Sequence, residues 1–325
     1  MKSLEDKIFK NFTFFISLIP VFILISIFVF LLIYSIPSIK YNGLTFFTSY
    51  LWYPGQFNQP PIMKNGVMAP YGSNFGALLF ILGTILTSLL AIIIVLPLSL
   101  ILSITIHLYI PYRLRKIVYN MVQIFAAIPS VVYGLWGIVV LEPFLYYYLE
   151  PFLRDTLGFI PFFSGEIYSG AGIIASTIIL AIMVLPITTA VIMERFESMP
   201  EIIVNGAFAL GATRWEVAKH ILVKFSSKQI LGGTLLGLAR AIGETMAVLM
   251  VSGFALNIMP SNIYSPINTM AAAIAALLDS AFIDPTNMNL YALAELGMVL
   301  LIISMIVNII GRTIVGRGVI RGSFE

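Results

Sequence analysis

The sequence predicts an all-α polytopic membrane protein with six transmembrane helices and with both termini in the cytoplasm. Of its 325 residues, 59% are hydrophobic and only 10% are charged, whereas about a quarter of the residues in typical soluble domains are charged. The apolar residues gather in six long stretches, and lysine and arginine gather in alternate loops between them. This composition excludes a soluble enzyme, a disordered chain and a nucleic-acid-binding protein.

The six apolar stretches are each long enough to span a bilayer, because a helix needs about 20 apolar residues to cross a hydrocarbon core of roughly 30 Å. The first has too long an apolar core for a signal peptide, so we interpret it as a retained anchor. Prolines inside spans are tolerated where neighbouring helices satisfy the freed backbone groups. The predicted spans are 14–36, 75–107, 118–141, 171–193, 230–256 and 290–311.

The distribution of lysine and arginine predicts the orientation, because cytoplasmic loops carry an excess of both. Fourteen of the 18 lie in four alternate segments, which we predict to be cytoplasmic: 1–13, 111–117, 194–229 and 312–325. Three more lie in 37–74 and 142–170, and the last, Arg240, lies within a span. We therefore expect 37–74, 142–170 and 257–289 to be external.

Two external stretches have structure-forming patterns of their own. Segment 37–74 is rich in aromatic residues, glycine and proline, which predicts an ordered extracytoplasmic loop or small cap. Residues 270–282 are apolar but too short to span. A seventh span there would also put the basic C-terminus outside, so we expect a re-entrant or interfacial helix.

The cytoplasmic loop 194–229 carries two helix-start signals. Ser198–Glu201 and Thr213–Glu216 both fit the capping-box pattern, and Gly211 stands where a C-terminal glycine belongs. The loop is therefore predicted to form two short helices joined at Gly211. The first helix is small and apolar, which fits either a groove on a partner or packing against the protein's own span ends.

Two charged residues interrupt the fifth predicted span. Arg240 and Glu244 are four positions apart, so in one helix they share a face and can pair. A charge at the bilayer centre costs about 2.5–3.5 kcal/mol on insertion scales, so two unrelated ones are improbable. Two interpretations stay open: a structural ion pair, or an anion pathway in which the planar guanidinium binds phosphate or sulfate oxygens.

The sequence predicts that this chain is not an enzyme. It has no cysteine and only two histidines, which lie far apart. It also lacks a G-x-x-x-x-G-K-[ST] nucleotide-binding motif. We therefore expect no catalytic residue, no bound metal and no cofactor, and any ATP is hydrolysed by a separate subunit.

Residues 205–216, Asn-Gly-Ala-Phe-Ala-Leu-Gly-Ala-Thr-Arg-Trp-Glu, resemble the EAA loop of ABC importer permeases. The family pattern is Glu-Ala-Ala, three residues, then Gly, and Ala207 and Gly211 match it. Asn205 stands for the Glu and Gly206 for the first Ala. The resemblance departs from the family pattern in two respects: the Glu is lost, and Lys224 and Lys228 stand where relatives usually show prolines. The resemblance implies that the loop docks on an ATP-binding subunit. The implied coupling residues are Asn205, Gly206, Ala207, Gly211, Ala212 and Thr213.

Four further stretches resemble the permease family of the phosphate-specific importer, and its PstC-type subunit more than its PstA-type subunit. They are 71–77, 83–88, 127–137 and 238–248. The resemblance implies the type I ABC importer permease fold, with a core of five transmembrane helices over 75–311, in a prokaryotic plasma membrane. It also implies that Arg240 and Glu244 line the substrate pathway.

The implied function is ATP-driven import of inorganic phosphate, with this chain forming half of the pathway. The implied partners are a second homologous permease of the PstA type, an ATPase dimer and an extracytoplasmic phosphate-binding protein. Two alternatives remain at this point: an ion-coupled secondary transporter of a small anion, and an ABC permease for another oxyanion such as sulfate or molybdate. The absence of an internal repeat disfavours the secondary transporter.

Overall fold

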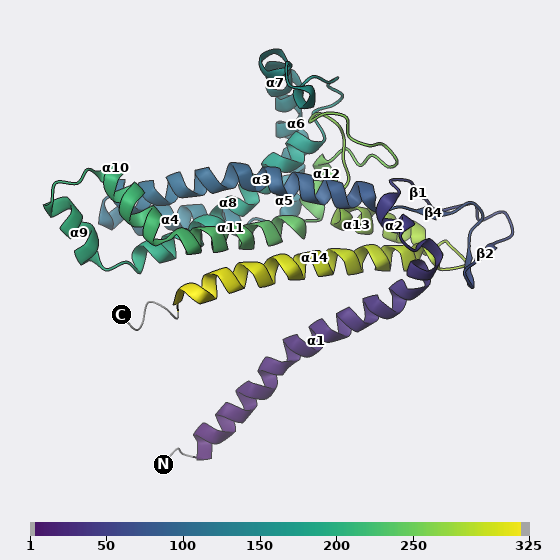
Figure 1. Cartoon of the computed structure of the whole chain (residues 1–325), viewed down its shortest axis with the longest axis horizontal. Coiled ribbons are helices and arrows are strands. Elements are labelled where there is room, and N and C mark those ends of the chain that lie inside the picture. The colour runs from purple at the N-terminus through teal and green to yellow at the C-terminus, as the bar shows by residue number, and fades with distance from the viewer. Residues whose placement is uncertain (1–3, 320–325) are drawn as a thin grey trace.

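The computed structural model describes residues 4–319, and it describes the surroundings of side chains over residues 9–313. The predicted terminal segments 1–13 and 312–325 therefore lie partly outside the described residues. The chain is mostly helical, with long helices running roughly side by side and small sheets gathered at one end (Figure 1). This arrangement confirms the predicted all-α class.

Within the described residues, five helices are long and apolar enough to cross a membrane. Four of them coincide with predicted spans. They are α1 (Leu4–Asn42), α3 (Leu78–Ile104) with its π-helical extension η1 (Thr105–Tyr109), α8 (Ile173–Glu197) and α14 (Met288–Val319). Pro97 and Pro186 lie within α3 and α8, and neither ends its helix.

The predicted span 118–141 is wrong. Helix α4 (Tyr112–Ala127) ends before Ile128 and Pro129, which are both extended, with ψ angles of 129° and 140°. The residue before a proline avoids the helical region for steric reasons, which accounts for the break. The apolar helix instead runs over residues 130–157, so much of the predicted external segment 142–170 is helical.

This long helix alternates between α- and π-helical turns and projects to one side of the bundle (Figure 1). A π-helical turn widens the helix by one residue and re-aims the side chains that follow. The consecutive segments are α5 (Ser130–Trp136), η2 (Gly137–Leu141), α6 (Glu142–Phe144), η3 (Leu145–Leu149) and α7 (Glu150–Leu157). A single 3-10 turn follows as η4 (Pro161–Phe163).

The predicted span 230–256 is divided in two. Helix α11 (Ser227–Ile242) and helix α12 (Met246–Val251) are separated by three residues that are not helical. Neither piece reaches the roughly 20 residues that a crossing needs. The described residues therefore hold five uninterrupted candidate spans and one broken segment, rather than six continuous helices.

The centre of the bundle is built around α8, which packs against α3, α11 and α12. One apolar cluster joins Ala91 and Val95 of α3 to Leu180 and Val184 of α8. Small residues let the helices approach closely: a Cβ at Gly237 of α11 would lie only 2.7 Å from Thr188 Oγ1 of α8. Close backbone approach of this kind is how membrane helices associate.

The segment after α1 forms the ordered cap that the sequence predicts. Helix α2 (Thr45–Thr48) precedes two antiparallel strand pairs. Trp52 is buried, with its ring edge-on to Phe75 and Phe80 at centroid distances of 5.2 and 5.3 Å. The side chain of Asn257 accepts from the Trp52 N–H and donates to the Trp52 carbonyl oxygen. The strand pairs are β1 (Trp52–Tyr53) with β4 (Asn74–Phe75), and β2 (Ile62–Lys64) with β3 (Val67–Ala69).

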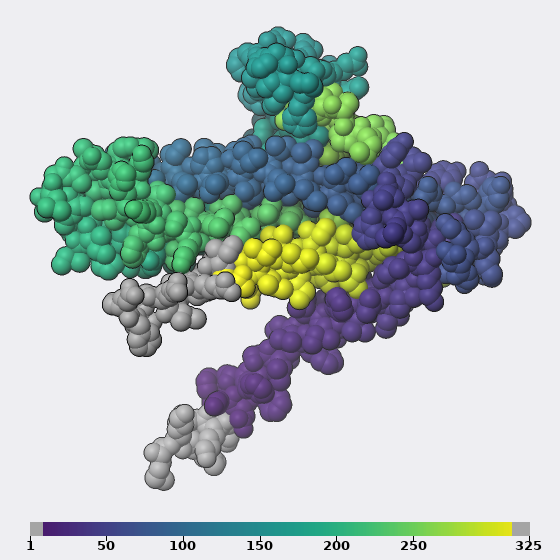
Figure 2. Space-filling model, viewed as in Figure 1, coloured from purple at the N-terminus to yellow at the C-terminus, as the bar shows by residue number. Residues whose placement is uncertain are grey.

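The predicted short helix is present as α13 (Met270–Ala281), which Thr269 caps. Its buried face joins the cap and the start of α14 in one apolar cluster. Helix α1 packs mainly against α14 near this cap and then diverges from the bundle (Figures 1 and 2). Glu295 of α14 is 3% exposed and faces Ser38 and Asn42 of α1, so a polar contact joins the first helix to the last.

Candidate functional site

The break between α11 and α12 is a short, tight turn. The Glu244 N–H donates to the Ala241 carbonyl oxygen at 3.3 Å, and the Leu249 N–H donates to the Thr245 carbonyl oxygen at 2.9 Å as the next helix begins. The Thr245 hydroxyl donates to the Gly243 carbonyl oxygen at 3.3 Å. The chain thus leaves one helix and enters another within residues 243–245.

The break lies near the middle of the neighbouring spans. Ala241 and Val248, on either side of it, both belong to the apolar cluster formed by the central turns of α3 and α8. Non-helical backbone at membrane depth is tolerated only where protein buries it or where it lines a water-filled cavity. Broken helices at this depth are typical of transport sites, so the break marks the candidate pathway.

Arg240 and Glu244 both lie at this break, but they do not share a helix. Arg240 is in the last turn of α11 and is exposed, whereas Glu244 follows the end of that helix and is half-buried. Within the described part of the chain, the ion pair found within 4.0 Å is Arg154–Asp155, so these two side chains are not paired. The expected shared face and pairing are therefore wrong, because the helix ends at Ile242.

The exposed guanidinium of Arg240 has a chemical consequence. It is a cation that presents five donors in a planar fork. Since no carboxylate of this chain neutralises it among the described residues, the charge is free to meet an anion or a neighbouring subunit. The role of Arg240 and Glu244 in a pathway stays a prediction.

The cytoplasmic loop forms two short helices joined at Gly211, as predicted. They are α9 (Glu201–Ala209) and α10 (Arg214–Glu216), which continues as η5 (Val217–Val223). Gly211 has a φ of +87°, in the left-handed region that glycine adopts most readily. An added Cβ at Gly211 would meet nothing within 4 Å, so backbone conformation alone requires the glycine.

One of the two predicted capping boxes is present. The Thr213 N–H donates to a Glu216 carboxylate oxygen at 2.7 Å, and the Glu216 N–H donates to the Thr213 hydroxyl at 3.3 Å. These hydrogen bonds from Thr213 hold the pKa of the Glu216 carboxyl below its usual range. The box at 198–201 is wrong, because the Ser198 hydroxyl donates to the Arg195 carbonyl oxygen and Pro200, rather than Ser198, is the N-cap residue of α9.

Helix α9 presents apolar side chains to its surroundings. It has no fully buried residue, and Ile202 and the following Leu210 are 80% and 92% exposed. Only Val204 packs against the apolar cluster at the ends of η1 and α8. Of the two interpretations that the sequence leaves open, packing on the protein's own span ends therefore accounts for little of this surface.

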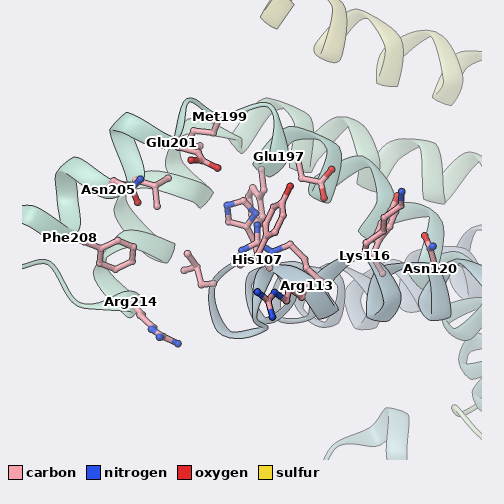
Figure 3. A pocket seen from close by; sticks show the side chains of 16 residues that line it. His107, Arg113, Lys116, Asn120, Glu197, Met199, Glu201, Asn205, Phe208 and Arg214 are labelled. Carbon is pink, nitrogen blue, oxygen red and sulfur yellow. Dashed lines mark hydrogen bonds between the residues drawn. The ribbon is translucent and has the colours of Figure 1, made fainter.

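A cavity of about 1130 Å³, which no sequence pattern indicates, lies beside α9 (Figure 3). Its walls come from η1 and the start of α4, from the end of α8, and from the loop. His107 lies half-buried in it, 5.7 Å from the Phe196 ring between centroids, with its Nδ1 unpartnered among the described residues. The basic residues of 111–117, which in the sequence indicate orientation, also line this cavity.

The comparisons with known proteins agree with the fold. Residues 96–317 match the family described as "Binding-protein-dependent transport system inner membrane component". A chain of the bacterial alginate ABC transporter, solved in complex with a periplasmic protein bound to an alginate pentasaccharide, superposes with a TM-score of 0.57. At 16% identity over 97% of both chains, that likeness shows a shared fold.

Relatives of higher identity cover nearly the whole chain. The phosphate transport system permease protein PstC 1 of Mycobacterium bovis is 38% identical over 304 residues, which are 93% of this chain and 90% of that protein. The phosphate transport system permease protein PstC of Pasteurella multocida is 35% identical over 301 residues, which are 90% and 88% of the two chains. The chain is thus a multi-pass membrane transport subunit rather than an enzyme, and it belongs to the family of binding-protein-dependent transport system inner membrane components.

Proposed function

We propose that this chain is the permease subunit of an ATP-driven importer for inorganic phosphate and that it forms half of the translocation pathway. The observation that carries the proposal is an exposed, unpaired arginine at a helix break near mid-depth. Relatives named as phosphate transport system permeases, with 35–38% identity over at least 90% of this chain, support phosphate as the substrate.

Arg240 is the pathway residue that the chemistry favours. A phosphate dianion loses its hydration partway across the membrane, and a fixed guanidinium fork replaces part of it with charge-assisted hydrogen bonds. Conduction also requires that the anion leave again. Glu244, a few residues away at the same break, moderates the positive charge and accepts a hydrogen bond from a protonated phosphate oxygen.

The apolar surface of α9 is the proposed contact with an ATP-binding subunit. Gly211 ends the helix sharply, and the Thr213 capping box begins the next one, so the loop is a preformed projection. The coupling residues are those of the EAA-like stretch, Asn205–Ala207 and Gly211–Thr213. ATP-driven closure of the partner then moves α9 and, through η5, the broken helix α11.

The remaining partners follow from the exposed surfaces. Arg240 is exposed in the single chain, which fits a pathway shared with a second, homologous permease of the PstA type. An ATPase dimer would cover the two coupling loops, and an extracytoplasmic phosphate-binding protein would deliver the substrate to the cap over residues 44–77. This chain itself binds no cofactor in this proposal.

Uptake by the reconstituted complex tests the proposed function. The chain is assembled with its co-expressed subunits in proteoliposomes, and radiolabelled phosphate uptake is measured with and without enclosed ATP. We expect ATP-dependent uptake that survives collapse of the ion gradients and that excess sulfate or molybdate does not inhibit. Uptake driven by an ion gradient, or preference for another oxyanion, would contradict the proposal.

The proposed topology has six crossings, with the broken α11–α12 segment as one of them, and both termini in the cytoplasm of a prokaryotic cell. Figure 1 agrees in placing α9 and the start of α1 toward one end of the long axis and the strands toward the other. We expect cysteine tags at 113–116 and near Arg214 to react only from the cytoplasm. Tags at Gln56 and at the exposed Ser261, beside the buried Asn262, should react from outside. Protection of the tag at Ser261 from outside would require a different number of crossings.

A further inference from the structure

The cavity beside α9 is lined by more positive than negative charge. Its cationic side chains are Arg113, Arg115, Lys116 and Arg214, and its carboxylates are Glu197 and Glu201. The cations come from two separate parts of the chain, the start of α4 and the loop, and all four line one space of about 1130 Å³. The proposed transport pathway at Arg240 does not use this space.

The positive charges in the cavity are not neutralised by its own carboxylates. The ion pair found within 4.0 Å in the described residues is Arg154–Asp155, so Glu197 and Glu201 pair with none of the four cations. The described residues also offer Arg113 and Lys116 no hydrogen-bond partner closer than 3.5 Å. Both side chains are exposed to the open space beside them.

The other two arginines are held in place. The Arg115 guanidinium donates to the His107 carbonyl oxygen and lies 5.7 Å from the centre of the Tyr112 ring. The Arg214 guanidinium lies 5.2 Å from the centre of the Tyr109 ring, which fixes its approach from the loop. Two pre-positioned guanidinium groups and two free cations therefore share one cavity.

The geometry of the lining favours an anion that several donors can share. Arg113 and Lys116 are three residues apart on α4, so they lie on one face of that helix. Figure 3 shows them on the wall formed by α4, with Arg214 and Asn205 across the cavity on the loop side. Arginine and lysine have no acceptor atoms, so their natural partner is an oxyanion with oxygens to spare.

We propose that this cavity binds a phosphate group, which Arg113 and Lys116 hold from α4 and Arg214 holds from the loop. Two sources present this chemistry: the headgroup of an anionic phospholipid and free inorganic phosphate. Basic pockets at the cytoplasmic ends of membrane helices bind anionic headgroups in this way. A bound phosphate bridges α4 and the loop, and so ties the position of α9 to the helical core.

The test has one arm for each source. In the lipid arm, the full chain with its co-expressed subunits is placed in phosphatidylcholine nanodiscs with or without phosphatidylglycerol, and retained phosphatidylglycerol is counted by native mass spectrometry. In the free-anion arm, inorganic phosphate is titrated calorimetrically into the complex in phosphatidylcholine-only nanodiscs, without the extracytoplasmic phosphate-binding protein. This second arm uses the Arg240→Gln background, so that binding in the proposed pathway does not contribute.

The decisive variant is Arg113→Gln/Lys116→Gln. We expect it to weaken binding about 30-fold in the arm that binds, since two charge-assisted contacts are lost. The matched control, Lys219→Gln/Lys228→Gln, removes two exposed cations of the same loop region that do not line the cavity, and should retain binding. Asn205→Glu, which adds a carboxylate to the cavity and removes no cation, should weaken binding as well.

The two arms distinguish a lipid headgroup from free phosphate and from the absence of a binding site. Binding in the lipid arm assigns the site to a headgroup, and binding in the free-anion arm assigns it to inorganic phosphate. Binding in neither arm, or an equal loss in the lysine control, overturns the proposal and leaves these residues as solvated surface charges. Because both readouts are binding, a failed uptake experiment at Arg240 leaves this result unaffected.

Discussion

Arg240→Gln is expected to lower phosphate uptake by about 100-fold while the complex still assembles. A charge at the bilayer centre costs about 2.5–3.5 kcal/mol, and each 1.36 kcal/mol is a factor of ten in rate. Removing the cation that offsets the charge of the phosphate dianion should therefore lower the uptake rate by about two powers of ten. Because Arg240 is exposed and unpaired among the described residues, its loss strands no buried partner. Uptake into proteoliposomes, normalised to complex recovered, measures the effect.

Further substitutions at Arg240 and Glu244 distinguish a role in the substrate pathway from a purely structural role. Arg240→Lys should retain little uptake, because an ammonium keeps the charge and loses the planar fork. Glu244→Gln should alter uptake by holding phosphate more tightly. The matched control is Arg154→Gln, which removes the arginine of the exposed ion pair and should leave uptake unchanged. Near-normal uptake by Arg240→Leu/Glu244→Leu at normal yield would eliminate the pathway role.

Gly211→Val is expected to uncouple ATP hydrolysis from transport. A β-branched residue at a φ of +87° is strained by about 1–3 kcal/mol, so the loop should relax to another turn and re-aim α9. An added Cβ meets no neighbour within 4 Å, so the effect is conformational rather than a clash. We expect at least a tenfold fall in phosphate transported per ATP hydrolysed, with unchanged membrane insertion.

A matched glycine controls for backbone strain. Gly43 also has a positive φ, of +56°, with open space around an added Cβ, but it lies in the connection after α1. Gly43→Val should therefore carry a similar local penalty and keep transport coupled. Gly211→Asn should be milder than Gly211→Val, since asparagine tolerates the left-handed region. Equal uncoupling by the two valine variants would show that strain in general, and not the loop, is responsible.

The sequence predicts the long spans well because a bilayer demands length and apolarity, and both are properties of a single segment. It does not predict where a proline breaks a helix. Pro97 and Pro186 remain inside α3 and α8, whereas Pro129 separates α4 from α5. The Gln123 side chain of α4 donates to the Pro186 carbonyl oxygen at 3.1 Å, a tertiary contact between two proline-containing segments that no local pattern reveals.

The candidate site shows the same limit. Arg240 and Glu244 stand out because charge within an apolar stretch is conspicuous in any sequence. The turn that separates them is not evident from the sequence, because a single glycine such as Gly243 is common inside membrane helices. On either side of the turn, Ala241 and Val248 pack against α3 and α8, and these contacts exist only in the folded chain. The basic cavity was missed for a related reason: its lining comes from three segments that only the folded chain brings together.

The contact between α1 and α14 sets an order for biosynthesis. Helix α1 is the first to leave the ribosome, and the helix it mainly packs against is the last. Three polar residues of α1 are buried in the complete fold: Ser35, Ser38 and Asn42. Until α14 has been synthesised, they lack the cover of that helix and the polar contact with Glu295. Contacts between distant parts of a chain form late. Docking of α1 onto α14 therefore completes the fold, and in a chain truncated before α14 these polar side chains at the external end of α1 would lose their cover.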